Sequence, residues 1–233
     1  MNFFNPEQQP WKFLGRCVDF VGLSLCCVFC SLGIVTLGPS LTALYTSVVK
    51  AFRYGDNTPF REFFRVFRKE FRKGVILTLI CIPVLLLIAY GYSVMKANSS
   101  DKTGAFMFTF YYVLLILPVG TMLNLFPLLG RFELSIRDYI KTAFSLTIAH
   151  LPSTFVIVLL SVELTIWTLE YWSPAFITPS LWALLSSFFL ENNYKKHLSE
   201  DECAALEGIT VEEYREKEEE RKRVRGFFRR KKK

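Results

Sequence analysis

The chain has 233 residues, of which 52% are hydrophobic and 16% aromatic, and its mean hydropathy is positive at +0.29 despite a strongly charged C-terminal end. A soluble globular domain seldom has this composition, so the sequence favours a membrane protein. The net charge of +7 does not indicate nucleic-acid binding, because the cations lie beside apolar stretches and in the tail, where anionic lipid headgroups account for them.

The first long apolar stretch, residues 18–37, has the length of about 20 residues that a membrane-spanning helix needs. It contains Cys26, Cys27 and Cys30, of which the last two form a CxxC. No histidine or second CxxC lies nearby in the sequence, and the neighbouring residues are apolar. We therefore interpret these cysteines as packing residues rather than metal ligands.

A break in the apolar pattern follows at residues 36–40, where Gly38 permits a tight turn and Pro39 suits the first helical position. The break is either a connecting turn or part of an intramembrane polar site that includes Thr36 and Ser40, as in transporters with broken helices. The next apolar segment, residues 39–52, covers only about two thirds of a bilayer. It predicts a short span, a re-entrant half-helix or an interfacial helix.

Residues 60–73 read FREFFRVFRKEFRK and run directly into an apolar span at residues 75–95. Aromatic residues recur at three- and four-residue steps and arginines fill the positions between them, which predicts a helix with an aromatic face and a cationic face. Such a helix lies on an anionic membrane surface or docks on a partner. Its candidate docking residues are Phe60, Arg61, Phe64, Arg65, Phe67, Arg68, Phe71 and Arg72.

Three further spans are predicted at residues 105–129, 143–169 and 175–190. Between the first two, a short amphipathic helix is expected, and loops of this kind dock on soluble partners or serve as polar connectors. Its candidate partner or lipid contacts are Arg131, Arg137 and Lys141.

Two ionisable residues interrupt the predicted span at residues 143–169, namely His150 and Glu163. A charge at the bilayer centre costs on the order of 2 to 3 kcal/mol, so Glu163 is expected at a helix interface, in a cavity or at the outer boundary. Structural pairing and the handling of substrate or protons are both open for Glu163. His150 is the second candidate for an intramembrane polar site.

The composition changes after residue 196, which divides a membrane domain (residues 1–196) from a charged cytosolic tail (residues 197–233). Within the tail, Thr210 and Glu213 fit a capping box, and Glu213 and Lys217 are spaced for a helical ion pair. The tail is therefore expected to form a solvated charged helix. Its terminal GFFRRKKK suits anionic lipid or an acidic protein surface.

The distribution of Lys and Arg predicts the topology, because positively charged short loops stay in the cytoplasm. The strongest clusters are residues 53–73, residues 131–141 and the chain after residue 195. The fold class is thus an all-α, multi-pass helical bundle in the cell membrane. Six spans with both termini cytoplasmic follow if residues 39–52 cross, and five spans with an external N-terminus if they do not; we favour six.

Catalysis is poorly supported by the sequence, which has no nucleophile elbow, Gly-rich phosphate loop or paired-histidine metal motif. His150 and His197 are its two histidines. We predict a protein that is not an enzyme, with no catalytic residues, no metal and no cofactor.

Several motifs taken in order resemble the YesL family of bacterial integral membrane proteins. They are TLGPSLTALY at residues 36–45, the Phe and Arg helix up to Gly74, LFPLLGRFELS followed by IKTAF and HLP, and an N-terminal pattern that includes Trp11, Phe13, Leu14 and Asp19. The resemblance covers residues 1–196. It implies a membrane domain of unknown function that accompanies glycan uptake and breakdown in Gram-positive bacteria, and it implies no catalytic residues.

Three functions are compatible with these features. The first is an accessory or regulatory subunit of a carbohydrate ABC importer, with membrane lipids and a permease or ATPase subunit as partners and no nucleic acid. The second is a stand-alone small-solute transporter or channel, in which Glu163, His150 and the break at residues 36–40 line a polar path. The third is a membrane scaffold whose tail recruits a cytosolic factor. The pattern predicts no oligomeric state.

Overall fold

The computed structural model describes residues 9–53, 58–97, 102–171 and 176–194, together with parts of a helical stretch between residues 210 and 219. The elements in the four long ranges are α1 (Gln9–Cys30), the 3₁₀ helix η1 (Ile34–Thr36), α2 (Leu37–Arg53), α3 (Pro59–Ala97), α4 (Lys102–Arg131), α5 (Ile136–Ala149), α6 (Leu151–Tyr171) and α7 (Thr178–Tyr194). The described part of the chain is therefore all-α, as predicted.

The chain divides into two compact units, Met1–Leu190 and Glu191–Lys233, and we call the first the main unit. In the second unit, the backbone N–H of Glu213 donates to Thr210 Oγ1 at 3.4 Å, which is the bond that a capping box requires. The predicted ion pair between Glu213 and Lys217 and the terminal GFFRRKKK lie outside the described residues.

Three helices in the described ranges are long and apolar enough to cross a membrane: α3, α4 over Phe106–Arg131, and α6. Their outer surfaces expose large apolar side chains, including Leu87 on α3, Phe106 on α4 and Leu169 on α6. Apolar surface of this extent is stable against lipid rather than against water. The three helices indicate membrane association. The five or six spans predicted from the sequence are more than these three candidates, so that number stays a prediction.

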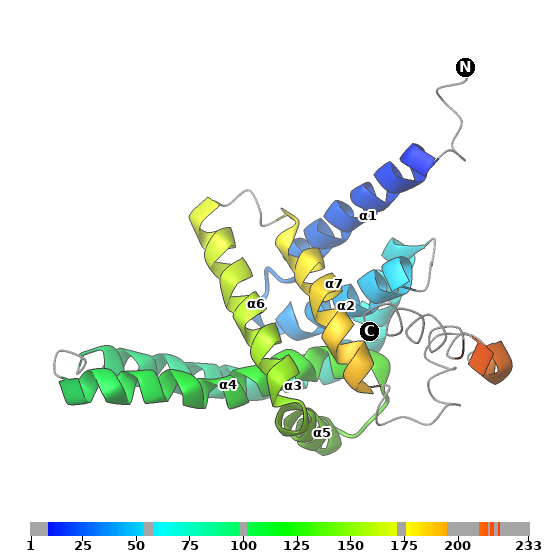
Figure 1. Ribbon diagram of the computed structural model, residues 1–233. Coiled ribbons are helices and arrows are strands. Elements are labelled where there is room, and N and C mark those ends of the chain that lie inside the picture. The colour runs from blue at the N-terminus through cyan, green and yellow to red at the C-terminus, as the bar shows by residue number, and fades with distance from the viewer. Residues whose placement is uncertain are drawn as a thin grey trace, which may run out of the picture. The chain divides into compact units, whose positions relative to one another are not determined.

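Helix α2 lies at the centre of the main unit, against α3 and α4 (Figure 1). Every residue from Thr42 to Val49 is buried, although several of them are polar. The hydroxyl of Thr46 donates to the carbonyl of Thr42 at 2.9 Å, and that of Thr42 donates to the carbonyl of Phe126 on α4 at 3.2 Å. These contacts enclose the middle of α2 within the helix bundle, and the short span, re-entrant half-helix or interfacial helix predicted at residues 39–52 stays a prediction.

Helix α1 ends at Cys30, earlier than the predicted span at residues 18–37. The cause is a set of hydroxyl bonds that compete with the helix: Ser31 Oγ donates to Val28 O at 2.9 Å, and Thr36 Oγ1 is 2.7 Å from Cys30 O and 2.6 Å from Gly33 O. The chain then passes through η1 into α2.

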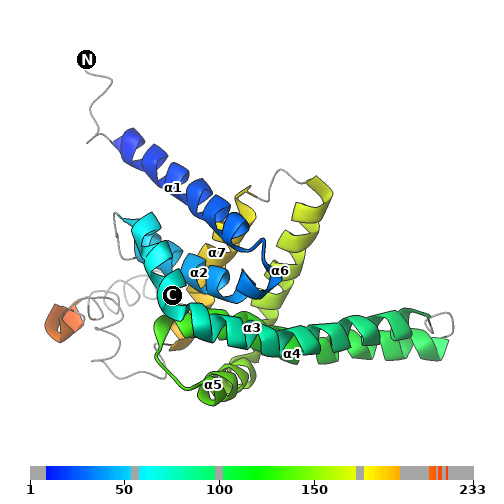
Figure 2. The same ribbon diagram turned by 180° about the vertical axis from the view of Figure 1, so that it is seen from behind.

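Helix α3 joins the predicted amphipathic segment and the predicted span in one helix of 39 residues, and Figure 2 shows that its axis changes direction along the way. At Gly74 the backbone passes so close to α2 that an added Cβ would lie 2.9 Å from Pro39 N. Thr78 Oγ1 also donates to the carbonyl of Gly74 at 2.7 Å, a bond that favours bending. Helices α3 and α4 then lie side by side (Figure 1).

The single span predicted at residues 143–169 is wrong, because two helices occupy this stretch. Helix α5 ends at Ala149, His150 has non-helical dihedral angles (φ −124°, ψ 44°), and α6 begins at Leu151. Pro152 explains the break, because proline lacks the N–H that would continue the hydrogen-bond ladder and restricts the residue before it.

Helix α7 is tied to three other helices by polar side chains. Ser24 Oγ of α1 donates to Ser180 Oγ at 2.7 Å, Trp182 Nε1 donates to Ser161 Oγ of α6 at 2.7 Å, and Arg53 Nη1 of α2 donates to the carbonyl of Ser187 at 2.7 Å. Helix α7 has 17 residues, and it contains the predicted span at residues 175–190 except for the part before Thr178.

Candidate docking surface

The first part of α3, residues 59–74, presents three faces rather than the two predicted from the sequence. Phe60, Phe64 and Phe71 are exposed, and Phe67 is half-buried beside them. All four arginines of this segment, Arg61, Arg65, Arg68 and Arg72, are exposed on the neighbouring face. The third face is buried and carries Glu62, Phe63, Val66 and Glu70. The predicted aromatic and cationic rows thus point outward while the third face anchors the helix.

Glu62 is the polar anchor of this helix, with only 6% of its surface exposed. Its Oε1 accepts hydrogen bonds from Lys50 Nζ of α2 at 2.5 Å and from Arg65 Nη2 at 2.6 Å. Burial alone would raise the pKa of Glu62, but the bonds from Lys50 and Arg65 outweigh it, so the pKa lies below its usual value. The carboxylate is therefore charged at neutral pH and holds α3 on α2.

A second set of contacts holds α3 against the α4–α5 connection. Lys69 Nζ forms an ion pair with Glu133, which raises the pKa of Lys69, and Lys73 Nζ donates to the carbonyl of Leu134 at 3.3 Å. Lys73 also lies 5.7 Å from the ring centroid of Tyr139. The two segments that the sequence singles out for docking are consequently joined into one surface.

Tyr139 organises the α4–α5 connection from the buried side of α5. Its hydroxyl donates to the carbonyl of Phe132 and accepts from the backbone N–H of Leu134 at 2.9 Å. The ring is completely buried.

We expect Tyr139→Phe to lower the free energy of unfolding by about 1–2 kcal/mol, because it removes the hydroxyl from two partly buried backbone partners and keeps the ring. Unfolding with SDS from dodecyl maltoside micelles measures the effect. Tyr112→Phe, on the exposed surface of α4, serves as the control and should change stability less. Equal stability of the two variants would contradict the role assigned to Tyr139.

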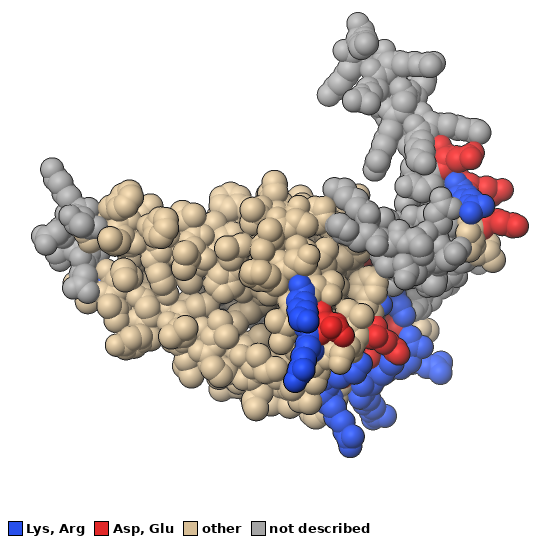
Figure 3. Space-filling model, turned by 90° about the horizontal axis from the view of Figure 1, so that it is seen from below, with Lys and Arg blue, Asp and Glu red and all other residues tan. Residues whose placement is uncertain are grey.

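The outer surface of α5 continues the docking surface. Arg137 and Lys141 are exposed, and beside them Ile140, Phe144 and Ile148 form an exposed row at four-residue steps. Arg131, the third predicted contact of this region, is half-buried at the end of α4. Figure 3 shows Lys and Arg side chains gathered toward one end of the main unit, while the rest of its visible described surface carries no charged residues. Apolar rows flanked by cations suit the boundary between headgroups and acyl chains.

The four residues predicted to form an intramembrane polar site are placed differently from one another. Ser40 Oγ donates to the carbonyl of Thr36 at 2.7 Å, so these two lie together at the junction between η1 and α2. His150 is half-buried between α5 and α6. Glu163 is exposed on α6, on the side opposite Ser161 and Thr165.

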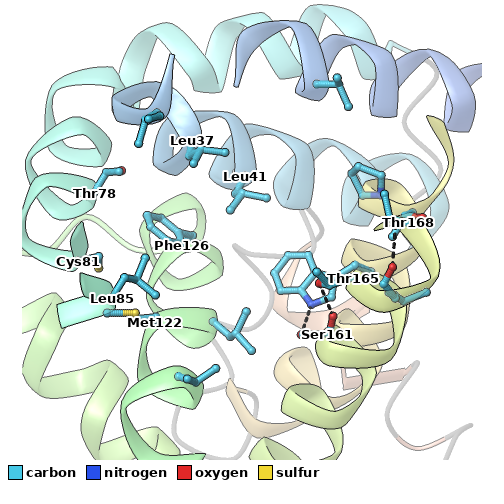
Figure 4. Close-up of a pocket in the computed structure, with 18 of the residues that line it drawn as sticks. Leu37, Leu41, Thr78, Cys81, Leu85, Met122, Phe126, Ser161, Thr165 and Thr168 are labelled. Atoms are coloured by element: carbon cyan, nitrogen blue, oxygen red, sulfur yellow. Dashed lines mark hydrogen bonds between the residues drawn. The ribbon is translucent and has the colours of Figure 1, made fainter. Parts of the chain in front are cut away.

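A cavity of about 500 Å³ lies within the main unit and is nearly apolar. Figure 4 shows residues of α2, α3 and α4, such as Leu41, Cys81 and Phe126, on one side and residues of α6, such as Thr165 and Thr168, on the other. Thr36, Ser40, His150 and Glu163 are not among the residues that line it. The cavity and the predicted polar site are therefore separate features.

Among the described residues, no three His, Cys, Asp or Glu side chains lie close enough to hold a metal ion. Cys27 is buried and Cys26 and Cys30 are half-buried on α1, where all three are free thiols.

Residues 20–92 match the family model described as "Protein of unknown function, DUF624". The matched region runs from α1 through α2 to the apolar part of α3, so it includes both the close approach of Gly74 to Pro39 and the exposed arginines of α3. It covers under half of the chain, and it is compatible with the YesL resemblance. No curated protein and no solved structure matches the chain.

The residues that fix the docking surface in place are not apparent from the sequence. Lys50, Glu62, Lys69 and Tyr139 had no assigned role, although Glu62 and Arg65 stand at the three-residue spacing of a helical ion pair. That spacing could have indicated Glu62. The partners Lys50 and Glu133 come from other segments, at separations that no local pattern reveals.

Proposed function

We propose that this protein is a non-enzymatic, multi-pass membrane protein that acts as an accessory or regulatory subunit, associated with a carbohydrate ABC importer. The observation that carries the proposal is the joined surface of α3 and α5, on which exposed cations and apolar side chains are held by Glu62, Lys69 and Tyr139. A preorganised surface loses little conformational entropy when a partner binds. The carbohydrate association comes from the YesL resemblance, and we propose membership of that family over residues 1–196.

We propose six spans with the cationic end and both termini in the cytoplasm. The gathering of Lys and Arg at one end supports this orientation, and so does the aromatic cluster of Tyr92, Phe108 and Tyr112 toward the far end of the α3–α4 pair, which suits the opposite interface. Labelling of Arg68→Cys from the cytoplasmic side, and of Lys96→Cys from the external side, tests the orientation. Labelling of Arg68→Cys from outside intact cells would overturn it.

Neutralising the arginine face should weaken binding to the ABC permease or ATPase. We expect Arg61→Gln, Arg68→Gln and Arg72→Gln together to reduce affinity about tenfold, since each exposed charge contributes a few tenths of a kcal/mol to about 1 kcal/mol. Arg65 is kept because it holds Glu62. The measurement is the amount of permease and ATPase that copurifies from native membranes at low and high salt.

Lys96→Gln is the matched control, because this exposed cation lies at the other end of α3. Its copurification should equal that of the parent protein. Recovery of neither permease nor ATPase with the parent protein would contradict the importer association, and equal recovery with the triple variant would contradict the docking surface.

The second candidate function is a stand-alone small-solute transporter or channel, and the nearly apolar cavity would suit only an apolar solute. The predicted polar path through Glu163, His150 and residues 36–40 gains no support from the cavity, whose walls come from other residues. Flux in vesicles reconstituted with Glu163→Gln tests this candidate, because loss of flux would assign Glu163 a coupling role. The scaffold alternative requires a phenotype when residues 212–233 are deleted.

A further inference from the structure

In the apolar cavity of the main unit, four of the hydroxyl groups that line the walls are already hydrogen-bonded to backbone carbonyls of their own helices. Thr78 Oγ1 donates to Gly74 O, Ser161 Oγ to Ile157 O, Thr165 Oγ1 to Ser161 O and Thr168 Oγ1 to Leu164 O, each at 2.7 Å. Trp182 Nε1 donates to Ser161 Oγ. A sugar in this cavity would lose its hydrogen bonds with water and find few replacements, a cost that excludes polar solutes.

Much of the remaining wall consists of aliphatic, aromatic and thioether side chains from three helices. Leu41 comes from α2, Ile82 from α3, and Val119, Met122 and Phe126 from α4. In Figure 4, Leu41, Met122 and Phe126 lie across the cavity from Ser161, Thr165 and Thr168 of α6. A volume of about 500 Å³ is within the range of roughly 300–1,000 Å³ that ligand sites occupy. Cavities with apolar walls accept apolar ligands.

The rim of the cavity opens on the apolar outside of the candidate spans. Leu85 of α3 is 50% exposed and Thr165 of α6 is also exposed, and both line the cavity while belonging to helices that can cross a membrane. The arginine face and the exposed cations of α5 do not line it. The molecule that is always present at such a rim is a bilayer lipid, whose acyl chain has the chemistry of the walls.

We propose that this cavity binds an acyl chain of a bilayer phospholipid, which enters between α3 and α6 and lies against Trp182. The bound chain fills space that the helices leave between them and joins α6 and α7 to α2, α3 and α4 through dispersion contacts. This site is independent of the docking surface and of any importer partner.

Fluorescence quenching by brominated lipid tests the proposal, because Trp182 lines the cavity and is only 8% exposed. Replacing Trp11, Trp167 and Trp172 by phenylalanine leaves Trp182 as the single tryptophan. In bilayers of phosphatidylcholine with brominated acyl chains, we expect this protein to lose most of the fluorescence that it shows in unbrominated bilayers.

Two substitutions fill the cavity from opposite walls, namely Val119→Phe on α4 and Thr165→Phe on α6. Each should restore most of the Trp182 fluorescence in brominated bilayers. The matched controls are Val113→Phe and Val162→Phe, on the same helices at exposed positions that do not line the cavity. Both controls should be quenched like the parent. Because Thr165 is exposed, its variant tests the site even where Val119→Phe does not fold.

Three results would overturn the proposal. The first is the absence of quenching in the parent, and the second is equal quenching in the cavity-filling variants and the controls, which would mean that bromine reaches Trp182 from outside. The third is quenching by brominated fatty acid added to unbrominated bilayers without any by brominated phospholipid, which would assign the site to free fatty acid.

Discussion

Gly38→Ala is expected to lower the free energy of unfolding by roughly 1–3 kcal/mol, the usual cost of overpacking a close helix contact. An added Cβ at Gly38 would stand 2.1 Å from Thr78 Oγ1, 2.6 Å from Phe126 Cε1 and 2.8 Å from the carbonyl oxygen of Gly74. A side chain can rotate away, but the carbonyl of Gly74 belongs to the backbone of α3. The methyl group would therefore separate α2 from both α3 and α4.

Gly15→Ala is the matched control, because an added Cβ there meets no heavy atom within 4 Å. Alanine favours helix over glycine by about 1 kcal/mol, so this variant should be at least as stable as the parent. Both free energies come from SDS unfolding in mixed micelles, followed by circular dichroism. If Gly38→Ala proved as stable as Gly15→Ala, the close contact between α2 and α3 would be refuted.

The spacing of aromatic residues and arginines made the exposed faces of α3 predictable, since a single helical period contains the information. Its buried face was not predictable in the same way. Glu62 and Glu70 have the appearance of surface residues, and only the approach of Lys50 from α2 makes burial of Glu62 stable. The ion pair of Lys50 with Glu62 depends on how α2 packs against α3, and the spacing of residues within one helix does not specify this packing.

Helix breaks were less predictable than apolar segments, because hydropathy sums over side chains and a break depends on backbone bonds. The stretch at residues 143–169 is apolar over most of its length, yet Pro152 marks the end of one helix and the start of another. At residues 30–36 the hydroxyls of Ser31 and Thr36 donate hydrogen bonds to backbone carbonyls near the end of α1. In both places the residues that break the helix are visible in the sequence, but their apolar neighbours dominate the hydropathy from which a span is predicted.

The candidate polar residues show a further limit of sequence patterns. Glu163 stands out in the sequence as an acidic residue in an apolar helix, but the sequence does not specify which side of α6 faces α4. The contacts between α4 and α6 place Gly120 against Thr154, where an added Cβ would lie 2.3 Å from the threonine methyl group. This close packing orients α6 with Ser161 and Thr165 along the cavity and Glu163 outside.

Glu62→Gln should lower the free energy of unfolding by about 2 kcal/mol at neutral pH. This value lies between those for exposed and for fully buried ion pairs, because Glu62 is buried whereas its partner Arg65 is largely exposed. The pKa of Glu62 is lowered from 4.5, so its contribution to stability is fully present above that value and disappears as the pH falls through the lower folded-state pKa. The loss caused by Glu62→Gln should therefore diminish below about pH 4.5.

Glu70→Gln is the comparison variant on the same buried face of α3, and we expect it to change the free energy of unfolding in the opposite direction. Burial raises the pKa of Glu70 above 4.5, and its nearest ion-pair contact, Lys69 Nζ, is 3.9 Å away. The folded state therefore favours the protonated acid, and stability is lost as the pH rises through this raised pKa. Replacing the carboxylate by an amide removes that cost, so Glu70→Gln should equal or exceed the parent in stability at pH 7.

We therefore expect the free energies of unfolding of both variants to approach that of the parent, from opposite sides, as the pH is lowered from neutral to acidic. Glu62→Gln starts below the parent at pH 7 and Glu70→Gln starts level with it or above it, and both differences shrink as the carboxyl groups of the parent take up protons. If both variants lost stability equally at pH 7, burial would not distinguish the two carboxylates. The bonds from Lys50 and Arg65 would then not be what holds α3 on α2.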